Sequence, residues 1–284
     1  FMNSGSSGGG VFHDGSATNA GATVAACSFV ANEADFGAGA FLGGGPLTVD
    51  ASQFLLNDAR FGGGLWAQDA PSFDLTSCQF HGNTTPAEDD SGGAGLVVSE
   101  SLNLAVSDCL FAGNTSQLGG GALIYQSTGT IESTSFQANW VNSLGGALYL
   151  EGSYLELLDD LFTGNEAVSG GGAIHARDDN IVALHRSSLL GNRAGTGGGI
   201  AVDSGSLSMT NCLVNASEGD GAAIYFDGST LSIEHTTLYD NVAPEGSAAI
   251  VIVSEPSGVS LQHSIVAESE PTALSCNGTG MAWD

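Results

Sequence analysis

The residues best suited to chemistry in this sequence are three carboxylic acids, a histidine and an arginine: Glu132, Glu156, Asp159, His185 and Arg186. Carboxyl groups with a histidine can share the acid and base steps that cleave a glycosidic bond, and an arginine can act as the base of a lyase. Their separations are close to the period of a repeat in the chain. The elements that form this repeat therefore decide whether the five side chains meet.

The repeat is marked by an asparagine that recurs at intervals between 23 residues (Asn192 to Asn215) and 31 residues (Asn83 to Asn114). Most of these asparagines follow an aromatic or aliphatic residue three positions earlier and precede a run of small residues such as GGGAI. A period in this range indicates a stack of supersecondary units. We predict a structural ladder along the stack formed by Asn3, Asn32, Asn57, Asn83, Asn114, Asn139, Asn165, Asn192, Asn215 and Asn241.

Equivalent positions of successive repeats carry similar side chains. Three residues before each asparagine the sequence reads Phe29, Phe54, Phe80, Phe111, Phe136, Phe162, Leu189, Cys212 and Leu238. After each asparagine comes a second row that we expect to point inward, made of Val11, Phe41, Leu65, Leu96, Leu123, Leu148, Ile174, Ile200, Ile224 and Ile250. Apolar residues spaced by two within each segment indicate strands. We predict one all-β domain over residues 1–284, a single parallel β-helix of about ten three-strand coils.

Short phrases within the repeat resemble a known family. FVAN at 29–32, FLLN at 54–57, GGAL at 145–148 and GGAI at 171–174 are similar to the FxxN and GGA[ILV] repeats of the polymorphic outer-membrane proteins. Related repeats occur in proteins with a right-handed, pectate-lyase-like β-helix. The resemblance implies a right-handed helix in a secreted or surface-displayed, adhesin-like rod, and its motifs mark the scaffold without carrying catalytic residues.

The charge balance of the chain limits its partners. Thirty-one acidic residues face four arginines, and the net charge is -27. Such a surface repels nucleic acid and anionic membranes, so binding to nucleic acid is excluded as a main function. No apolar run reaches the roughly 18 residues that cross a bilayer. We expect an extracellular or cell-surface location and, because the first coil lacks its Phe-row residue, a piece of a longer chain.

An outward row beside the GGAI strand is the candidate surface for a ligand or partner. Its aromatic members are Phe12, Trp66, Tyr149, His175 and Tyr225, and it continues through Val97, Ile124, Ala201 and Val251. An exposed stripe of this kind is typical of a partner interface or a surface on which sugars stack. A slip of one residue would instead turn the row inward and make it core.

Two other segments depart from the regular repeat. The loop at 84–91 is longer than its equivalents and concentrates Glu88, Asp89 and Asp90. Their oxygens could hold calcium, which is the one cofactor that the sequence suggests. Residues 254–284 read as an irregular C-terminal coil. We expect no other cofactor, and we place His235 and His263 in different rows without a metal-binding partner.

The cysteines and arginines have a structural interpretation. Cys27, Cys78 and Cys109 belong to a row of small residues, in which a Cys78–Cys109 disulfide is the alternative to free core thiols. Each arginine has an acidic neighbour one coil away, which predicts ion pairs that stabilise the stacking register. The predicted pairs are Arg60 with Asp35, Arg186 with Asp159, Arg193 with Glu166, and Arg177 with Glu151 and Asp203.

These observations leave a preferred class of function, an enzymatic alternative and, as a third class, a pure carbohydrate-binding module. The preferred one is a non-enzymatic rod, an adhesin, stalk or filament-forming passenger. Its partners would be other β-helix subunits or the rest of a parent chain, with glycans as a further ligand class. The alternative is a polysaccharide lyase or glycoside hydrolase that uses the Glu132–Arg186 patch. Against the alternative, a polyuronate would meet an acidic surface without the cluster of Lys and Arg that would neutralise its carboxylates.

Overall fold

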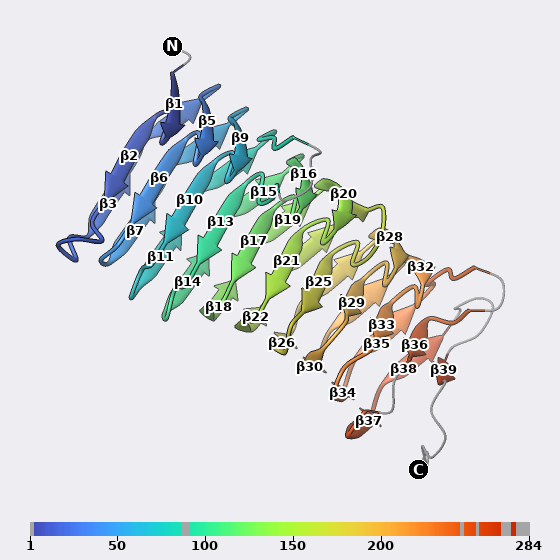
Figure 1. Cartoon of the computed structure of the whole chain (residues 1–284). Helices are drawn as coiled ribbons and strands as arrows, with labels where there is room; N and C mark the ends of the chain where they lie inside the picture. The colour runs from blue at the N-terminus through green and yellow to red at the C-terminus, as the bar shows by residue number, and fades with distance from the viewer. Residues whose placement is uncertain (1–2, 87–90, 245–246, 254–255, 268–273, 277–284) are drawn as a thin grey trace.

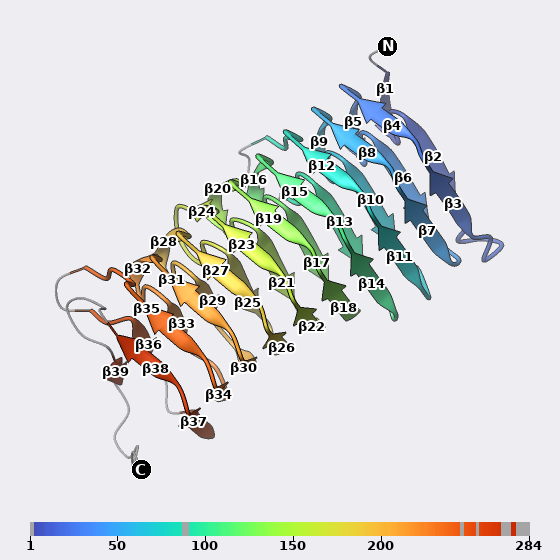
Figure 2. The same cartoon turned by 180° about the vertical axis from the view of Figure 1, so that it is seen from behind.

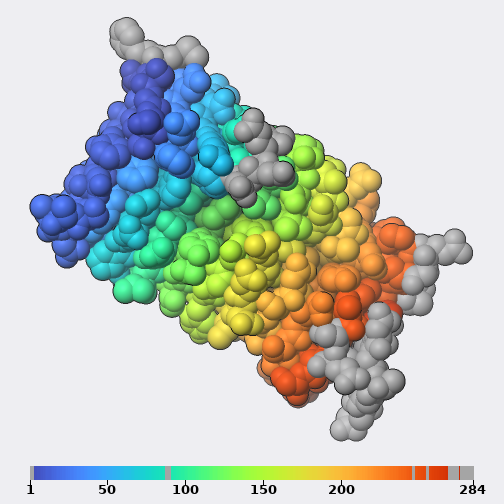
Figure 3. Space-filling view, viewed as in Figure 1, coloured from blue at the N-terminus to red at the C-terminus, as the bar shows by residue number. Residues whose placement is uncertain are grey.

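Short parallel strands stacked coil upon coil make up the computed structural model, which describes residues 3–86, 91–244, 247–253, 256–267 and 274–276. The strands follow one another around a rod that runs from the N-terminal coils at one end to the C-terminal coils at the other (Figure 1 and Figure 3). No helix occurs among the described residues, and so none there could cross a membrane. The all-β prediction is confirmed, as is the parallel stacking.

Three long sheets run along the rod, each taking one strand from nearly every coil. The first sheet consists of β2 (Val11–Asp14), β6 (Ala40–Gly43), β10 (Leu65–Gln68), β13 (Leu96–Ser99), β17 (Ala122–Tyr125), β21 (Leu148–Glu151), β25 (Ile174–Arg177), β29 (Ile200–Val202), β33 (Ile224–Phe226), β36 (Ile250–Ile252) and β39 (Leu274–Cys276). The second consists of β3 (Ala22–Ala25), β7 (Leu47–Asp50), β11 (Phe73–Thr76), β14 (Leu104–Ser107), β18 (Thr128–Glu132), β22 (Tyr154–Leu158), β26 (Asn180–His185), β30 (Gly205–Thr210), β34 (Thr230–Glu234) and β37 (Gly258–Gln262).

The third sheet lies on the opposite side of the rod and faces the viewer in Figure 2. It consists of β4 (Ser28–Val30), β8 (Gln53–Leu55), β12 (Gln79–His81), β15 (Leu110–Ala112), β19 (Ser135–Gln137), β23 (Leu161–Thr163), β27 (Ser188–Leu190), β31 (Leu213–Asn215), β35 (Thr237–Tyr239) and β38 (Ile265–Ala267). Between the third and first sheets, the loops form two narrower sheets of three and five strands, which isolated bridges through Thr84 and Gly92 connect along the rod. We call the two together the short sheet. Its strands are β1 (Ser4–Ser7), β5 (Glu33–Phe36), β9 (Asp58–Phe61), β16 (Thr115–Leu118), β20 (Trp140–Leu144), β24 (Glu166–Ala167), β28 (Arg193–Thr196) and β32 (Glu218–Asp220).

The interior is a column of side chains stacked on their counterparts. The rings from Phe29 to Phe162 lie parallel in successive coils, with centroids 4.6 to 5.0 Å apart. The packing leaves no space for a Cβ at Gly95, because it would lie 2.4 Å from the carbonyl oxygen of Gly121 and 3.0 Å from the Phe111 ring. Small residues in the GGA phrases therefore let the turns of backbone approach the Phe column closely.

The asparagine ladder is formed as predicted over most of its length. Oδ1 of Asn114 accepts hydrogen bonds from the backbone N–H and from the side chain of Asn83, both at 3.0 Å. Nδ2 of Asn114 donates to the carbonyl oxygen of Phe80 and to Asn139 in the next coil. The same pattern links Asn32, Asn57, Asn83, Asn114, Asn139, Asn165 and Asn192.

The ladder prediction is wrong at Asn215, which pairs with Leu190 and Tyr239 at the end of strand β31. Ser217 occupies the ladder position, since its backbone N–H donates to Oδ1 of Asn241 at 3.1 Å. The coil after Asn192 is therefore two residues longer than the asparagine spacing indicates. The same slip moves Cys212 out of the Phe column, where Val214 stacks between Leu189 and Leu238.

A second ladder stabilises the corner between the second and third sheets. Each member accepts a hydrogen bond from the backbone N–H of the coil before it, as Ser52 does from Cys27, Cys109 from Cys78 and Thr134 from Cys109. The residue just before each member has a positive φ, which turns the chain sharply and aims the next side chain along the stack. Cys78 and Cys109 are both free thiols, so the alternative of a disulfide is wrong.

Replacing Asn114 by alanine should lower the free energy of unfolding by about 2–4 kcal/mol, because it removes the acceptor for two buried N–H donors of Asn83. Urea denaturation followed by circular dichroism measures this change. Asn215→Ala is the matched control: Asn215 lies off the ladder and should cost less than about 0.5 kcal/mol. Equal losses for the two variants would contradict the ladder's role.

Candidate functional site

The predicted aromatic stripe lies on the outward side of the first sheet, but most of it is covered. Its register is Phe12, Phe41, Trp66, Val97, Leu123, Tyr149, His175, Ala201, Tyr225 and Val251. Tyr149 and His175 are each only 2% exposed, whereas Phe12 is 56% exposed. The prediction of a continuous exposed stripe is therefore wrong for the middle of the rod.

The short sheet provides this cover. Its residues Phe36 and Phe61 pack against the indole of Trp66, with centroids 5.0 and 5.6 Å away. The predicted direction is wrong for three residues of this sheet: Phe41 and Leu123 lie in the outward row, while Ile124 points into the core. Loop lengths differ from coil to coil, so a fixed count from the asparagine slips by one residue.

Polar groups surround the buried centre of this row. His175 stacks on Tyr149 with centroids 5.7 Å apart, and its Nε2 lies 3.2 Å from Oδ2 of Asp203. The two side chains are within ion-pair distance, but they are not aligned for a hydrogen bond. Both ring nitrogens of His175 therefore lack a hydrogen-bond partner. The Tyr149 hydroxyl donates to Glu151 at 3.0 Å, and Nε of Arg177 lies 3.4 Å from the same carboxylate oxygen.

The electrostatics of this group favour binding over proton transfer. Burial, with a further contribution from Glu151, raises the pKa of Tyr149 well above its usual range. The imidazole of His175 holds the pKa of Asp203 below its usual range. A general acid or base must reach its substrate, and the 2% exposure of His175 prevents this. Arg177 and Asp203 remain exposed and can contact a polar ligand.

The alternative catalytic patch is only partly assembled on the second sheet. Arg186 donates two hydrogen bonds to Asp159, at 2.8 and 2.6 Å, and this pair holds the pKa of Asp159 below its usual range. Glu132 and His185 occupy the same row two coils apart, with Leu158 between them. Glu156 has the Tyr154 hydroxyl as its partner at 3.4 Å. The predicted ion pair between Arg186 and Asp159 is thus formed. The predicted catalytic group is not, because two carboxylates do not meet beside His185.

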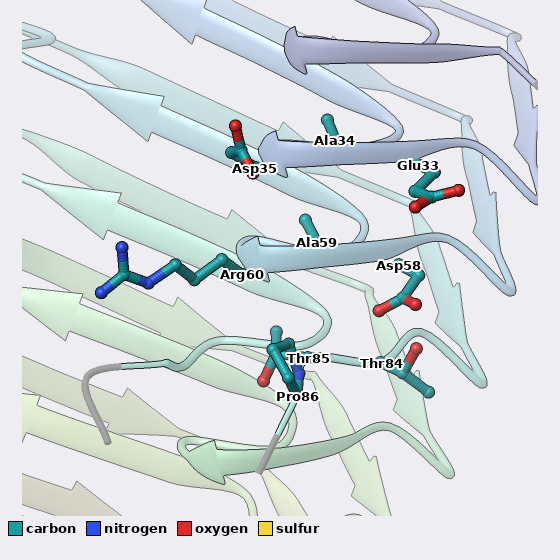
Figure 4. A pocket seen from close by; sticks show the side chains of 9 residues that line it. All are labelled: Glu33, Ala34, Asp35, Asp58, Ala59, Arg60, Thr84, Thr85 and Pro86. Atoms are coloured by element: carbon teal, nitrogen blue, oxygen red, sulfur yellow. The ribbon is translucent and has the colours of Figure 1, made fainter. Parts of the chain in front are cut away.

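A depression at the corner of the short sheet holds acidic side chains from two coils (Figure 4). Its volume is about 410 Å³, and Glu33, Asp58 and Thr84 follow one another along its floor. The guanidinium of Arg60 lies over the ring of Phe61, 5.6 Å from its centroid. Arg60 and Asp35 are neighbours in register, but no ion pair between them forms within 4 Å, so that predicted ion pair is wrong.

The other predicted ion pairs have mixed outcomes. Arg177 pairs with Glu151 as expected and also lies 3.5 Å from Asp178. Arg193 stands in register between Glu166 and Glu218, and its side chain pairs with Glu218 at 3.4 Å. The direction of an arginine along the stack therefore depends on the local rotamer, which the sequence repeat does not specify.

The calcium prediction cannot be placed, because Glu88, Asp89 and Asp90 lie outside the described residues. A group that the sequence analysis missed lies instead near the end of the rod, where Glu234, His235 and His263 each direct one potential metal ligand toward the others. The sequence did contain a pattern that could have revealed this group. The row of small residues at the corner between the second and third sheets continues from Thr236 to Ser264, and each of these two residues follows a histidine.

Comparison with known proteins agrees with this architecture. The family model described as right handed beta helix region matches residues 2–139 and 119–282. The chain belongs to this right-handed β-helix family. The right-handed β-helix prediction is confirmed by the match, whereas the narrower resemblance to the polymorphic outer-membrane proteins stays a prediction. The chain matches no curated protein and no solved structure in these comparisons.

Among the residues that the structure describes, one carboxyl group is buried in the right-handed β-helix. Asp160 occupies the small-residue ladder, where it is 2% exposed, and its Oδ1 accepts the N–H of Thr134 at 2.8 Å. Its neighbours in the ladder each donate to the carbonyl two residues earlier, as Thr134 does to Glu132 at 3.0 Å. A carboxylate cannot donate, and Oδ2 of Asp160 has no partner. Burial raises the pKa of Asp160 to about 8.

Asp160→Asn should stabilise the β-helix at alkaline pH, because the amide supplies the missing donor and carries no charge. The folded-state pKa of Asp160 exceeds the unfolded value, so its contribution is fully present below about pH 4 and is lost as pH rises toward about 8. The variant's advantage should therefore grow across this range, to on the order of 5 kcal/mol.

Urea denaturation of both proteins between pH 4 and pH 9 measures the difference. The control is Asp108→Asn, which removes an exposed carboxylate from the same corner two coils earlier and should shift stability equally little at every pH. If the unfolding free energies of Asp160→Asn and the natural protein run parallel over the whole pH range, the buried acid is not protonated.

Proposed function

We propose that this chain is a non-enzymatic rod of an exported or cell-surface protein, and that it packs side by side with a second β-helix of the same kind through its third sheet. The observation that carries the proposal is the distribution of charge. No residue in the ten strands of the third sheet is Asp, Glu, Lys or Arg, although the chain as a whole carries 35 of them, 31 acidic and four basic.

We call the outward side chains of this sheet the uncharged face. All are exposed or half-buried, and they are Ser28, Val30, Gln53, Leu55, Gln79, His81, Leu110, Ala112, Ser135, Gln137, Leu161, Thr163, Ser188, Leu190, Leu213, Asn215, Thr237, Tyr239, Ile265 and Ala267. The second sheet, by contrast, turns Asp50, Asp74, Glu132, Glu156 and Glu234 outward. Figure 2 shows the third sheet, whose strands carry this face, running the length of the rod.

Electrostatics favour this face for contact between two copies. Two rods of charge -27 repel each other, and any contact through the second or short sheet would set carboxylates against carboxylates. Contact through the uncharged face keeps the acidic sheets apart and in water. It also avoids the free-energy cost of desolvating charged groups.

Geometry supports a second β-helix as the occupant. Adjacent strands of any sheet lie about 4.8 Å apart, so two β-helices that lie side by side have the same spacing along their axes. Their rows of side chains can therefore interdigitate over many coils. Ten strands of three residues cover roughly 450 Å² per copy, or about 900 Å² for two. That is near the lower limit for specific association and suits rods held close together on a surface.

The specific role that we propose for the rod is based on the resemblance of its sequence repeats. The FxxN and GGA[ILV] phrases support an adhesin-like or stalk-like role similar to that of the polymorphic outer-membrane proteins, and the acidic composition suits an extracellular setting. The cover over Tyr149 and His175 argues against a sugar-stacking stripe in the middle of the first sheet. Glycans remain ligands for the exposed N-terminal end of that row, at Phe12.

Leu190→Glu should weaken lateral association, because it places a half-buried carboxylate in the uncharged face of both copies. Sedimentation equilibrium at rising protein and salt concentrations should show the natural protein associating, more strongly as salt screens the acidic sheets. Ser208→Glu adds the same charge at a half-buried outward position of the second sheet and should associate like the natural protein. A protein that stays monomeric at every concentration and salt level, or two variants that behave alike, would count against the proposal.

Incubation with pectate, alginate and other polyuronates should release no unsaturated or reducing ends, because His185 has no carboxylate pair beside it and His175 is buried. Absorbance of unsaturated products and a reducing-sugar assay make the measurement. Cleavage that disappears in Asp159→Asn or His185→Ala would overturn the non-enzymatic assignment and identify the second sheet as an active site.

A further inference from the structure

Two histidines and a glutamate meet at one corner of the rod, between the second and third sheets. The rings of His235 and His263 stack with centroids 4.9 Å apart and planes inclined by 8°. Nδ1 of His235 lies 3.5 Å from Oε1 of Glu234, and one ligand atom from each of the three residues lies within 4.8 Å of the others. Among the described residues, this is the single group of three such side chains arranged closely enough for one metal ion.

The backbone holds this arrangement. His235 and His263 both have φ of 49°, the left-handed conformation that this corner uses in every coil, so their side chains leave the chain in the same direction. The N–H of His235 donates to the carbonyl of Gln262 at 3.1 Å, and the N–H of Thr236 donates to Oγ of Ser264 at 3.2 Å. The Cα positions of the two histidines are therefore set by the same ladder that stacks the coils.

The donor set selects a class of metal. Two imidazole nitrogens and a carboxylate oxygen suit Zn²⁺, Ni²⁺, Co²⁺ or Cu²⁺, whereas Ca²⁺ and Mg²⁺ prefer oxygen alone. Ligands of a tetrahedral zinc ion lie roughly 3.4 Å apart when the metal–nitrogen distance is about 2.1 Å. The ligand atoms, which lie within 4.8 Å of one another, must therefore approach by at most about 1.4 Å. They can do so because both histidine rings are exposed and the His235 side chain keeps 51% of its surface accessible.

We propose that Glu234, His235 and His263 bind one divalent transition-metal ion of the zinc class, with water completing its coordination. The ion would link the β34–β35 corner to the β37–β38 corner in the following coil. It would act as a clamp between two successive turns near the end of the rod. The proposal is independent of lateral association, because these side chains lie outside the uncharged face.

Titration with Zn²⁺ in an isothermal calorimeter tests the site, with millimolar Ca²⁺ present to occupy the many surface carboxylates. One equivalent should bind with a dissociation constant in the micromolar range or below. Co²⁺ should give visible absorption bands of a nitrogen- and oxygen-ligated ion. Zn²⁺ should also raise the thermal midpoint of the natural protein, because it binds the folded form.

His235→Ala and His263→Ala should each weaken binding by about tenfold or more, since even loss of an outer-shell partner weakens metal sites by 10–100-fold. Glu234→Gln should weaken it less than either. His81→Ala removes an exposed histidine from the third sheet and should bind as the natural protein does. Circular dichroism of the metal-free variants verifies that each one folds. Failure to bind one equivalent in the presence of Ca²⁺, or unchanged affinity in both histidine variants, overturns the proposal.

Discussion

Hydrogen bonding between coils is the interaction on which the rest of this structure depends. A strand of three or four residues has no partner within its own turn, so its N–H and C=O groups pair with the turns before and after. Each residue is then held directly over its counterpart, about 4.8 Å away. Like side chains stack on like, and this is why the Phe column and the asparagine ladder extend over many coils.

The same stacking restricts which polar residues can be buried. A ladder residue must accept from the coil before it and donate within its own coil, as Thr134 does. Ser, Thr, Cys and Asn can meet both requirements, whereas an ionised Asp cannot. Asp160 is therefore the one ladder member that depends on protonation, because its second oxygen lacks a partner and burial raises its pKa to about 8.

Stacking also organises the outer surface, because outward residues form rows as regularly as inward ones. Acidic rows gather on the second and short sheets, and the third sheet is left without charge. Where a row brings two histidines together beside a glutamate, as at His235 and His263, a potential metal site arises from the register alone. Function on such a rod is therefore a property of rows that span several coils.

The fold could be predicted from the sequence, because equivalent side chains recur at a period that matches one coil, and a Phe or Asn at a fixed place in the repeat identifies its row. The sequence did not determine the loops, whose lengths vary, so Asn215, Phe41 and Leu123 were assigned to the wrong rows. Which outward residues are covered depends on packing between segments, which a linear repeat does not encode. Phe36 of the short sheet packs against Trp66, and Gly170, which bridges Leu144 and Thr196 of the same layer, lies next to the ring of His175. The direction of each charged side chain was likewise decided by local packing, as Arg193 shows by choosing Glu218 over Glu166.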